Sequence, residues 1–177
     1  INALYYDPKK EYVLDFVHAM KDIRDKRMRS LLPLDTTFQE DPVRMIRAIK
    51  YAAAGDFSIP FSLRKSIRRF SSELAETPTS RLTEEVFKIL QGGASAPTMR
   101  MAEQYGLLQY LLPSLRQEVM SREGKRGIKE LFLQLESLDR LIDTEDDAGR
   151  DRIIALVFGG YINIPDPGDP DFDALFK

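Results

Sequence analysis

The spacing of apolar residues after Asp41 constrains this chain more than any other feature of its sequence. Apolar side chains recur there every three or four positions, which places them on one face of an α-helix. Prolines and glycines interrupt the pattern, so it predicts a series of short helices. We expect these helices at residues 41–55, 62–76, 80–91, 97–105, 109–115, 128–142 and 151–162. The sequence therefore predicts a mainly α-helical fold.

Two of these helices begin with residues that are typical of helix N-termini. Asp41 precedes Pro42, which predicts an acidic N-cap followed by proline at the first helical position. Ser80, with Glu84 one turn later, predicts a capping box.

The first 34 residues do not follow the helical pattern. Aromatic and β-branched residues at 1–6 and 12–16 flank a polar turn, which predicts a β-hairpin. Residues 18–34 contain a short helical piece and a basic stretch without a clear period, and we interpret them as a connector. Because the chain opens without Met in β-prone sequence, we expect it to be a fragment, with its hairpin at the edge of a preceding sheet.

Composition excludes several classes of protein. The chain has no Cys and only His18 as a histidine, which rules out disulfides, thiol catalysis and zinc sites built on thiolates or several histidines. No apolar run approaches the roughly 18 residues of a membrane span, and no signal peptide is evident. We find no nucleophile elbow and no glycine-rich phosphate loop. These features predict a cytoplasmic protein without a complete active site in this sequence.

The net charge of −2 hides an uneven distribution of charge. Between Arg44 and Arg69 only Asp56 is acidic, whereas seven residues are basic: Arg44, Arg47, Lys50, Arg64, Lys65, Arg68 and Arg69. This density is typical of a surface that binds a polyanion such as a nucleoside triphosphate or an RNA backbone, although two solvated helix faces would give the same composition. Residues 143–173 are acidic, which predicts a solvated surface or a disordered edge, or alternatively a region that repels RNA.

The start of the helix at 41–55 holds the strongest candidate site. Arg44, Arg47 and Lys50 recur every three residues and form a cationic stripe near the positive end of the helix dipole. Asp41 places a hydrogen-bond acceptor beside the donors of Arg44. Such a pair fits adenine or cytosine, which present an amino group beside a ring nitrogen, but not guanine or uracil. Alternatively, Asp41 only caps the helix and pairs with Arg44.

Three motifs of the sequence resemble one known family. The runs INALYYDP (1–8), EDPVRMIRAIKYAA (40–53) and SRLTEEVFKILQGG (80–93) resemble, in this order, the class II nucleotidyltransferase family of bacterial poly(A) polymerases and CCA-adding enzymes. The resemblance covers roughly residues 1–115. It implies a remnant of a catalytic head domain at 1–34, a helical neck at 35–115 and the start of a helical body at 116–177, which ends in a loop rich in proline and aspartate.

The resemblance also assigns roles to individual residues. It implies that Asp41 and Arg44 read the base of the incoming nucleotide and that Arg47 and Lys50 line the nucleotide site, although the family usually has arginine at position 50. It implies that two residues of the later motif, Arg81 and Glu84, support the nucleotide-binding helix. The basic residues that suit the backbone of an RNA primer are Arg64, Lys65, Arg68 and Arg69.

The reaction that this resemblance implies is transfer of AMP from ATP to the 3′-hydroxyl of an RNA such as mRNA or tRNA, with release of pyrophosphate. Two magnesium ions would assist, and the family holds them in its head domain. The motifs favour poly(A) polymerase, and a CCA-adding tRNA nucleotidyltransferase is the alternative. Without the resemblance, the basic helices predict a non-catalytic α-helical RNA-binding or interaction module.

We therefore expect the 177-residue chain to be inactive alone, because the resemblance places the metal-binding carboxylates in the head domain. Incubation with ATP, magnesium and an RNA primer should give no extension on a denaturing gel. Measurable extension would show that the metal ligands are present in this chain.

Overall fold

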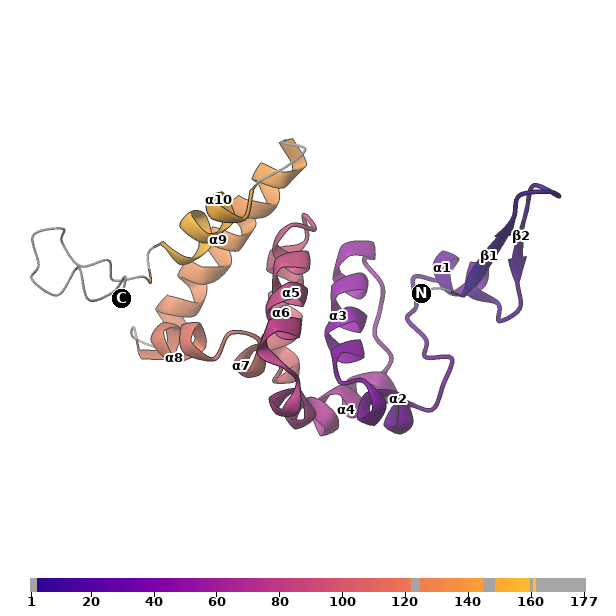
Figure 1. The fold of residues 1–177 in the computed structure, drawn as a ribbon, viewed down its shortest axis with the longest axis horizontal. Coiled ribbons are helices and arrows are strands. Elements are labelled where there is room, and N and C mark those ends of the chain that lie inside the picture. Colours follow the sequence, from indigo (N-terminus) through magenta and orange to yellow (C-terminus); the bar gives the residue numbers. More distant parts are fainter. Residues whose placement is uncertain (1–2, 122–124, 145–148, 160, 162–177) are drawn as a thin grey trace, which may run out of the picture.

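A two-stranded antiparallel hairpin begins the described part of the chain, which comprises residues 3–121, 125–144, 149–159 and 161 of a computed structural model. Strand β1 (Leu4–Asp7) pairs with β2 (Tyr12–Asp15), so that Leu4 lies opposite Asp15. The predicted hairpin is confirmed, and Ile1 and Asn2 lie outside the described residues. Figure 1 shows the hairpin at one end of a curved row of helices.

The carboxylate of Asp15 joins the hairpin to the short helix α1 (Ala19–Arg24). It accepts hydrogen bonds from the backbone amides of Val17, Ala19 and Met20, at 3.2, 2.8 and 2.9 Å. The bond from Met20, followed by those from Ala19 and Val17, outweighs partial burial and lowers the pKa of Asp15. A short helical piece was expected within 18–34, and α1 confirms it.

Helix α2 (Leu34–Glu40) is not predicted by the apolar pattern, because a helix of seven residues has room for only one repeat of buried positions. Phe38 is its buried anchor. The hydroxyl of Thr37 donates a hydrogen bond to the carbonyl oxygen of Pro33 at 2.8 Å. The helix begins where the expected head remnant (1–34) meets the expected neck (35–115).

The central helices follow the predicted pattern closely. They are α3 (Val43–Gly55), α4 (Phe61–Phe70), α5 (Thr79–Leu90) and α6 (Ser95–Tyr105), and α4 continues as a 3₁₀ helix, η1 (Ser71–Glu76). The predicted capping box at Ser80 is wrong, because α5 begins at Thr79 and Ser80 already lies in its first turn without a cap bond.

The remaining helices are α7 (Leu108–Leu111), α8 (Pro113–Ser121), α9 (Lys125–Thr144) and α10 (Arg150–Phe158). The single helix predicted at 109–115 is wrong. Leu112 has φ −138° and ψ 63°, because the ring of Pro113 disfavours helical backbone in the residue before it. The proline-rich loop at 164–171 and most of the acidic stretch 143–173 lie outside the described residues.

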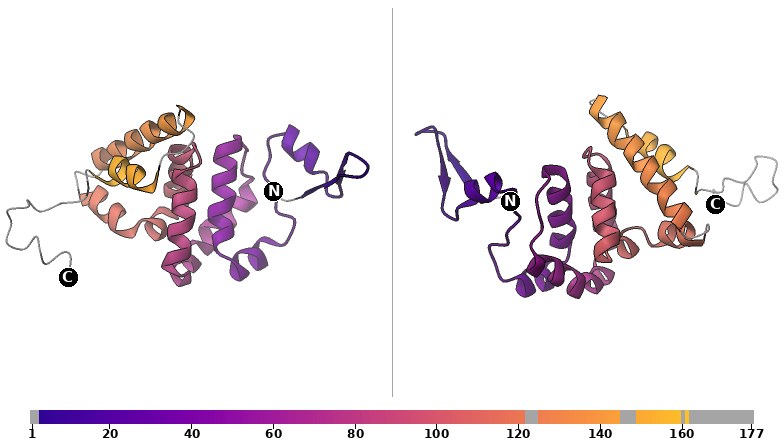
Figure 2. Two further views of the ribbon diagram at one scale, coloured as in Figure 1. Left: turned by 45° about the horizontal axis from the view of Figure 1, so that its top comes forward. Right: turned by 180° about the vertical axis from the view of Figure 1, so that it is seen from behind.

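Helix α6 forms the centre of the molecule, since it packs against α3 on one side and α9 on the other. Figures 1 and 2 show these helices one after another along the length of the molecule. Met99 of α6 and Ile49 of α3 are fully inaccessible to solvent, as is Leu138 of α9. One cluster of buried apolar residues extends from Phe38 to Val157, so residues on both sides of the expected division at 115/116 share a core. In the described ranges, no helix is long and apolar enough to cross a membrane.

Two leucines of α9 test the importance of this packing. Leu135 is 1% exposed, whereas Leu133 is 51% exposed. We expect Leu135→Ala to lower the free energy of unfolding by about 2–5 kcal/mol, because it leaves a cavity beside α6. Leu133→Ala, the matched control, should cost about 0.5 kcal/mol or less. Urea unfolding followed by circular dichroism measures both, and equal losses would contradict this packing.

Candidate functional site

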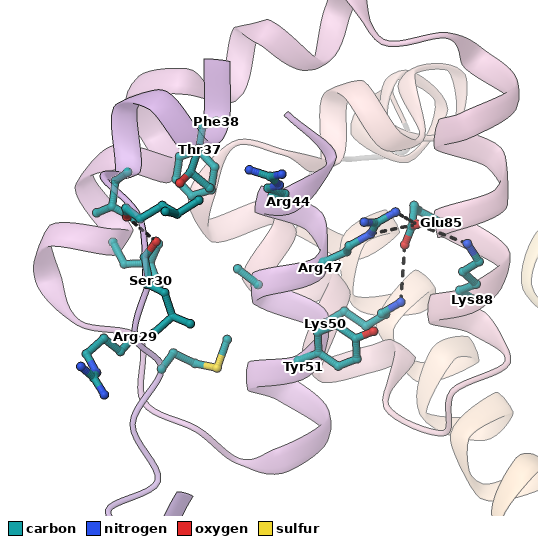
Figure 3. Close-up of a pocket in the computed structure, with 16 residues that line it drawn as sticks. Arg29, Ser30, Thr37, Phe38, Arg44, Arg47, Lys50, Tyr51, Glu85 and Lys88 are labelled. Carbon is teal, nitrogen blue, oxygen red and sulfur yellow. Dashed lines mark hydrogen bonds and ion pairs between the residues drawn. The ribbon is translucent and has the colours of Figure 1, made fainter. Parts of the chain in front are cut away.

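A cavity of about 540 Å³ opens between α3, α5 and the segment from Met28 to Phe38. Its two walls differ in chemistry, as Figure 3 shows. Four lining residues on α3 and α5 are cationic: Arg44, Arg47, Lys50 and Lys88. The facing segment contributes mainly apolar side chains: Met28, Leu31, Leu32, Leu34 and Phe38. Such a cavity fits a ligand that combines negative charge with a flat ring.

The predicted cationic stripe is present on α3. Arg44, Arg47 and Lys50 all line the cavity, because a spacing of three residues keeps them on the side of α3 opposite its core contacts. That core side carries Val43, Met45, Ile46, Ile49 and Ala52. The amphipathic pattern of α3 therefore positions the stripe and buries the helix at the same time.

Glu85 is the centre of the polar side of the cavity, although the sequence motifs do not indicate it as a site residue. Its side chain is 2% exposed. One carboxylate oxygen accepts hydrogen bonds from Arg47, with Nη2 at 3.1 Å and Nε at 3.3 Å. The Nζ atoms of Lys50 and Lys88 lie 3.4 and 3.3 Å from the carboxylate oxygens. Glu85 thus holds two cations of α3 and one of α5.

These contacts determine the ionisation of Glu85. Burial raises its pKa, but the hydrogen bonds from Arg47 and Lys88 and the positive charges of Lys50 and Arg47 outweigh burial and lower the pKa below the ordinary value of 4.5. The carboxylate is therefore charged at neutral pH. Because five cations line the cavity beside this one carboxylate, the cavity still carries a net positive charge.

Asp41 lies at the junction of α2 and α3, beside Arg44 and Arg81. Its Oδ2 is 3.8 Å from Nε of Arg44. Its Oδ1 is 2.9 Å from a guanidinium nitrogen of Arg81, as an ion pair without hydrogen-bond alignment. The expected N-cap bond is wrong, since the start of α3 has no side-chain cap. The carboxylate instead joins α5 to the start of α3.

Arg44 is held less firmly than the other cations. Its side chain is 40% exposed and lies 3.7 Å from Glu40 and 3.8 Å from Asp41, too far for strong hydrogen bonds. Its guanidinium group therefore has donors available to a ligand in the cavity.

Glu84 does not lie against α3. Its carboxylate accepts hydrogen bonds from Arg150 of α10 at 3.1 Å, and both side chains are about half exposed. Arg81 contacts α3 through Asp41, whereas Glu84 joins α5 to α10. The buried partner of the stripe is the neighbouring Glu85. Glu85 lies three residues after Leu82 and four before Ile89, which places it on the apolar face of α5. A charged residue at such a position indicates a buried ion pair in the sequence itself.

The basic residues of α4 form a separate region that does not line the cavity. Arg68 donates a hydrogen bond to the carbonyl oxygen of Gln104 at 3.4 Å, and Arg69 pairs with Asp35 at 3.1 Å. The side chain of Lys65 is exposed and that of Arg64 is partly buried. The structure therefore separates the predicted nucleotide residues from the predicted RNA residues.

No group of three or more His, Asp or Glu side chains that could hold a metal occurs among residues 3–121, 125–144, 149–159 and 161. The described residues therefore do not fit the magnesium ions that the resemblance implies.

Comparison with known proteins gives consistent matches. Residues 56–118 match a family model described as "Probable RNA and SrmB- binding site of polymerase A". The chain is 32% identical over 142 residues to poly(A) polymerase I of Haemophilus influenzae, which covers 80% of this chain and 31% of that protein. It is 29% identical over 126 residues to the CCA-adding enzyme of Bacillus velezensis, which covers 70% of this chain and 32% of that enzyme.

The fold is similar to that of a tRNA-processing enzyme solved with CTP. The TM-score is 0.60 at 20% sequence identity, and the match covers 90% of this chain and 52% of the other. This likeness concerns the fold, which confirms the predicted mainly helical class with its hairpin. The chain spans about a third of the length of the two curated relatives described above.

The pKa of Glu85 gives a prediction for stability. Glu85→Gln should lower the free energy of unfolding at pH 7 by about 1–3 kcal/mol, because an amide cannot satisfy three cations. Since folding lowers the pKa of Glu85 below 4.5, its stabilising effect is complete above that pH and is lost as the pH falls through the lower, folded-state pKa. The difference between wild type and variant should therefore shrink in acid.

Urea unfolding at pH 7, 5 and 3 measures this difference. Glu84→Gln is the matched control, since its exposed pair with Arg150 should contribute about 1 kcal/mol or less. Equal effects of the two substitutions at pH 7 would contradict the central role of Glu85.

Proposed function

Because this chain belongs to the class II nucleotidyltransferase family, which includes bacterial poly(A) polymerases and CCA-adding enzymes, we propose that it supplies the base-selecting and RNA-binding helices of an enzyme that extends RNA 3′ ends. The reaction proposed for the whole protein is transfer of AMP from ATP to the RNA 3′-hydroxyl, with release of pyrophosphate. The observation that carries this proposal is the cavity in which the stripe of α3 faces an apolar wall.

Base selection would use Arg44 and Asp41. The guanidinium of Arg44 lines the cavity, and Oδ2 of Asp41 lies next to it. An exocyclic amino group of adenine or cytosine would donate to Asp41, while the adjacent ring nitrogen accepts from Arg44. Guanine and uracil present a ring N–H beside a carbonyl oxygen, which reverses this pattern. Arg81 fixes Asp41 from the other side and keeps the acceptor in place.

Arg47 and Lys50 would contribute positive charge for the phosphates. Glu85 orients both, so their side chains are held before the ligand arrives and less conformational entropy is lost on binding. Arg47 is 41% exposed, whereas Lys50 is 15% exposed, so Arg47 is the more accessible of the two. Lysine at position 50 supplies a point charge without the bidentate geometry of arginine.

The adenosine-adding reaction is the first candidate, and CCA addition to tRNA is the second. The poly(A) polymerase of Haemophilus influenzae matches at higher identity and over more of the chain than the CCA-adding enzyme of Bacillus velezensis. The fold of a tRNA-processing enzyme with CTP supports the second candidate. The pair of Asp41 and Arg44 accepts adenine and cytosine alike.

Nucleotide binding by the chain tests the proposal. We expect ATP and CTP to bind more tightly than GTP and UTP in isothermal calorimetry. Arg44→Ala should weaken ATP binding by about 10- to 150-fold, because hydrogen bonds from a charged donor contribute about 1.5–3 kcal/mol. Arg140→Ala is the matched control, since Arg140 is exposed on α9 and its guanidinium donates to Ser137 of its own helix, far from the cavity lining.

Equal binding of all four nucleotides, unaffected by Arg44→Ala, would overturn the proposal. Salt-dependent RNA binding in that case would favour the non-catalytic RNA-binding module.

A further inference from the structure

Phe61, the first residue of α4, is 73% exposed. The three apolar residues that bury α4 are Leu63, Ile67 and Phe70. Leu63 also lines the cavity described above, whereas Phe61 does not. Phe61 therefore contributes neither to the core nor to the nucleotide cavity.

Helical geometry places Phe61 within the arc of the basic residues of α4, at the N-terminal end of that face. Successive residues are about 100° apart around the axis, so Arg64, Arg68, Lys65 and Arg69 fall in that order within an arc of about 140°. Phe61 projects about 60° from Arg64, between Arg68 and Lys65. We call this arc, with Phe61 and the four basic residues, the outer face of α4.

The charges of the outer face are only partly neutralised. Within the described ranges, Arg64, Lys65 and Arg68 form no ion pair. Arg68 donates to the carbonyl oxygen of Gln104 and lies over the ring of Tyr105, 5.6 Å from its centroid. Arg69 pairs with Asp35, but both side chains are more than half exposed, and such pairs are weak and readily exchanged for another anion. Helix α4 itself contains no acidic residue.

An exposed aromatic ring at the end of a row of cations is a combination that binds single-stranded nucleic acid. Bases stack on the ring without sequence preference, while the cations contact the phosphates. We propose that the outer face of α4 is a single-stranded RNA subsite in which one base stacks on Phe61 and the adjoining phosphates lie against Lys65 and the arginines. This inference rests on the proposed function in that RNA is the ligand.

Leu63, on another side of the same helix, lines the nucleotide cavity. The subsite therefore lies outside the cavity, where it would bind RNA regardless of the identity of the stacked base.

The first experiment uses the absence of tryptophan from the chain. Phe61→Trp introduces a single indole fluorophore at the proposed stacking position. Adding an adenosine 12-mer RNA should quench its emission strongly, since a stacked base contacts the indole directly. Phe16→Trp is the matched control, because Phe16 is also 73% exposed but lies beyond strand β2, and its emission should change little.

The second experiment separates stacking from charge. Phe61→Ala should weaken binding of the 12-mer by about 5- to 150-fold, from the range measured for base–aromatic stacking, and leave the slope of log K against log salt unchanged. Lys65→Gln should lower that slope by about 0.7, the contribution of one phosphate contact on a single strand. Phe61→Tyr, which keeps an aromatic ring, should bind like wild type. Inorganic polyphosphate, which has no bases, should bind Phe61→Ala and wild type equally.

Two results distinguish this inference from the proposed function. If the chain binds RNA but the indole of the Phe61→Trp variant is not quenched and Phe61→Ala binds normally, the subsite is wrong, and the outer face is free for a protein partner. If the chain binds neither nucleotide nor RNA, both proposals fail together.

Discussion

The buried carboxylate of Glu85 is the interaction on which the arrangement of the site depends. It accepts hydrogen bonds from Arg47 and Lys50 of α3 and from Lys88 of α5, so it links the polar sides of the two helices. Without it, three cations at one helix contact would repel each other, and the stripe would turn toward solvent. An anion placed behind the cations keeps them together and still leaves the cavity positive, because Arg44 is not neutralised by Glu85.

The surrounding fold makes this ion cluster possible. Helix α6 packs on α3 with fully inaccessible residues such as Met99 and Ala102, and this apolar contact holds the backbone of α3 in position. Helix α5 is anchored in the same way by Leu82, Ile89 and Leu90. The apolar faces therefore contribute most of the stability. The ion pairs of Glu85 and of Asp41 with Arg81 determine which polar groups of α3 and α5 lie together.

Local patterns in the sequence predict most of the helices and the cationic stripe, because spacing along one helix is a local property. Pro42 and the apolar positions of α3 are enough to place Arg44, Arg47 and Lys50 on one side of that helix. Contacts between distant elements cannot be obtained in this way. The pairing of Glu84 with α10 instead of α3 depends on how α5 is rotated in the core, and the break at Leu112 depends on a proline effect that periodicity does not capture.

The two basic regions have different physical requirements, and the fold keeps them apart. The proposed selection of a base would require fixed donors and acceptors in a partly enclosed site, and Asp41 and Arg44 lie close together at the edge of the cavity. Holding a strand of any sequence requires exposed charge and a flat apolar surface, which α4 presents on its outer face. If both proposed sites lay on one surface, the strand phosphates would compete for the cations proposed to bind the nucleotide. Helix α4 separates them, because Leu63 lines the cavity while Phe61 faces outward.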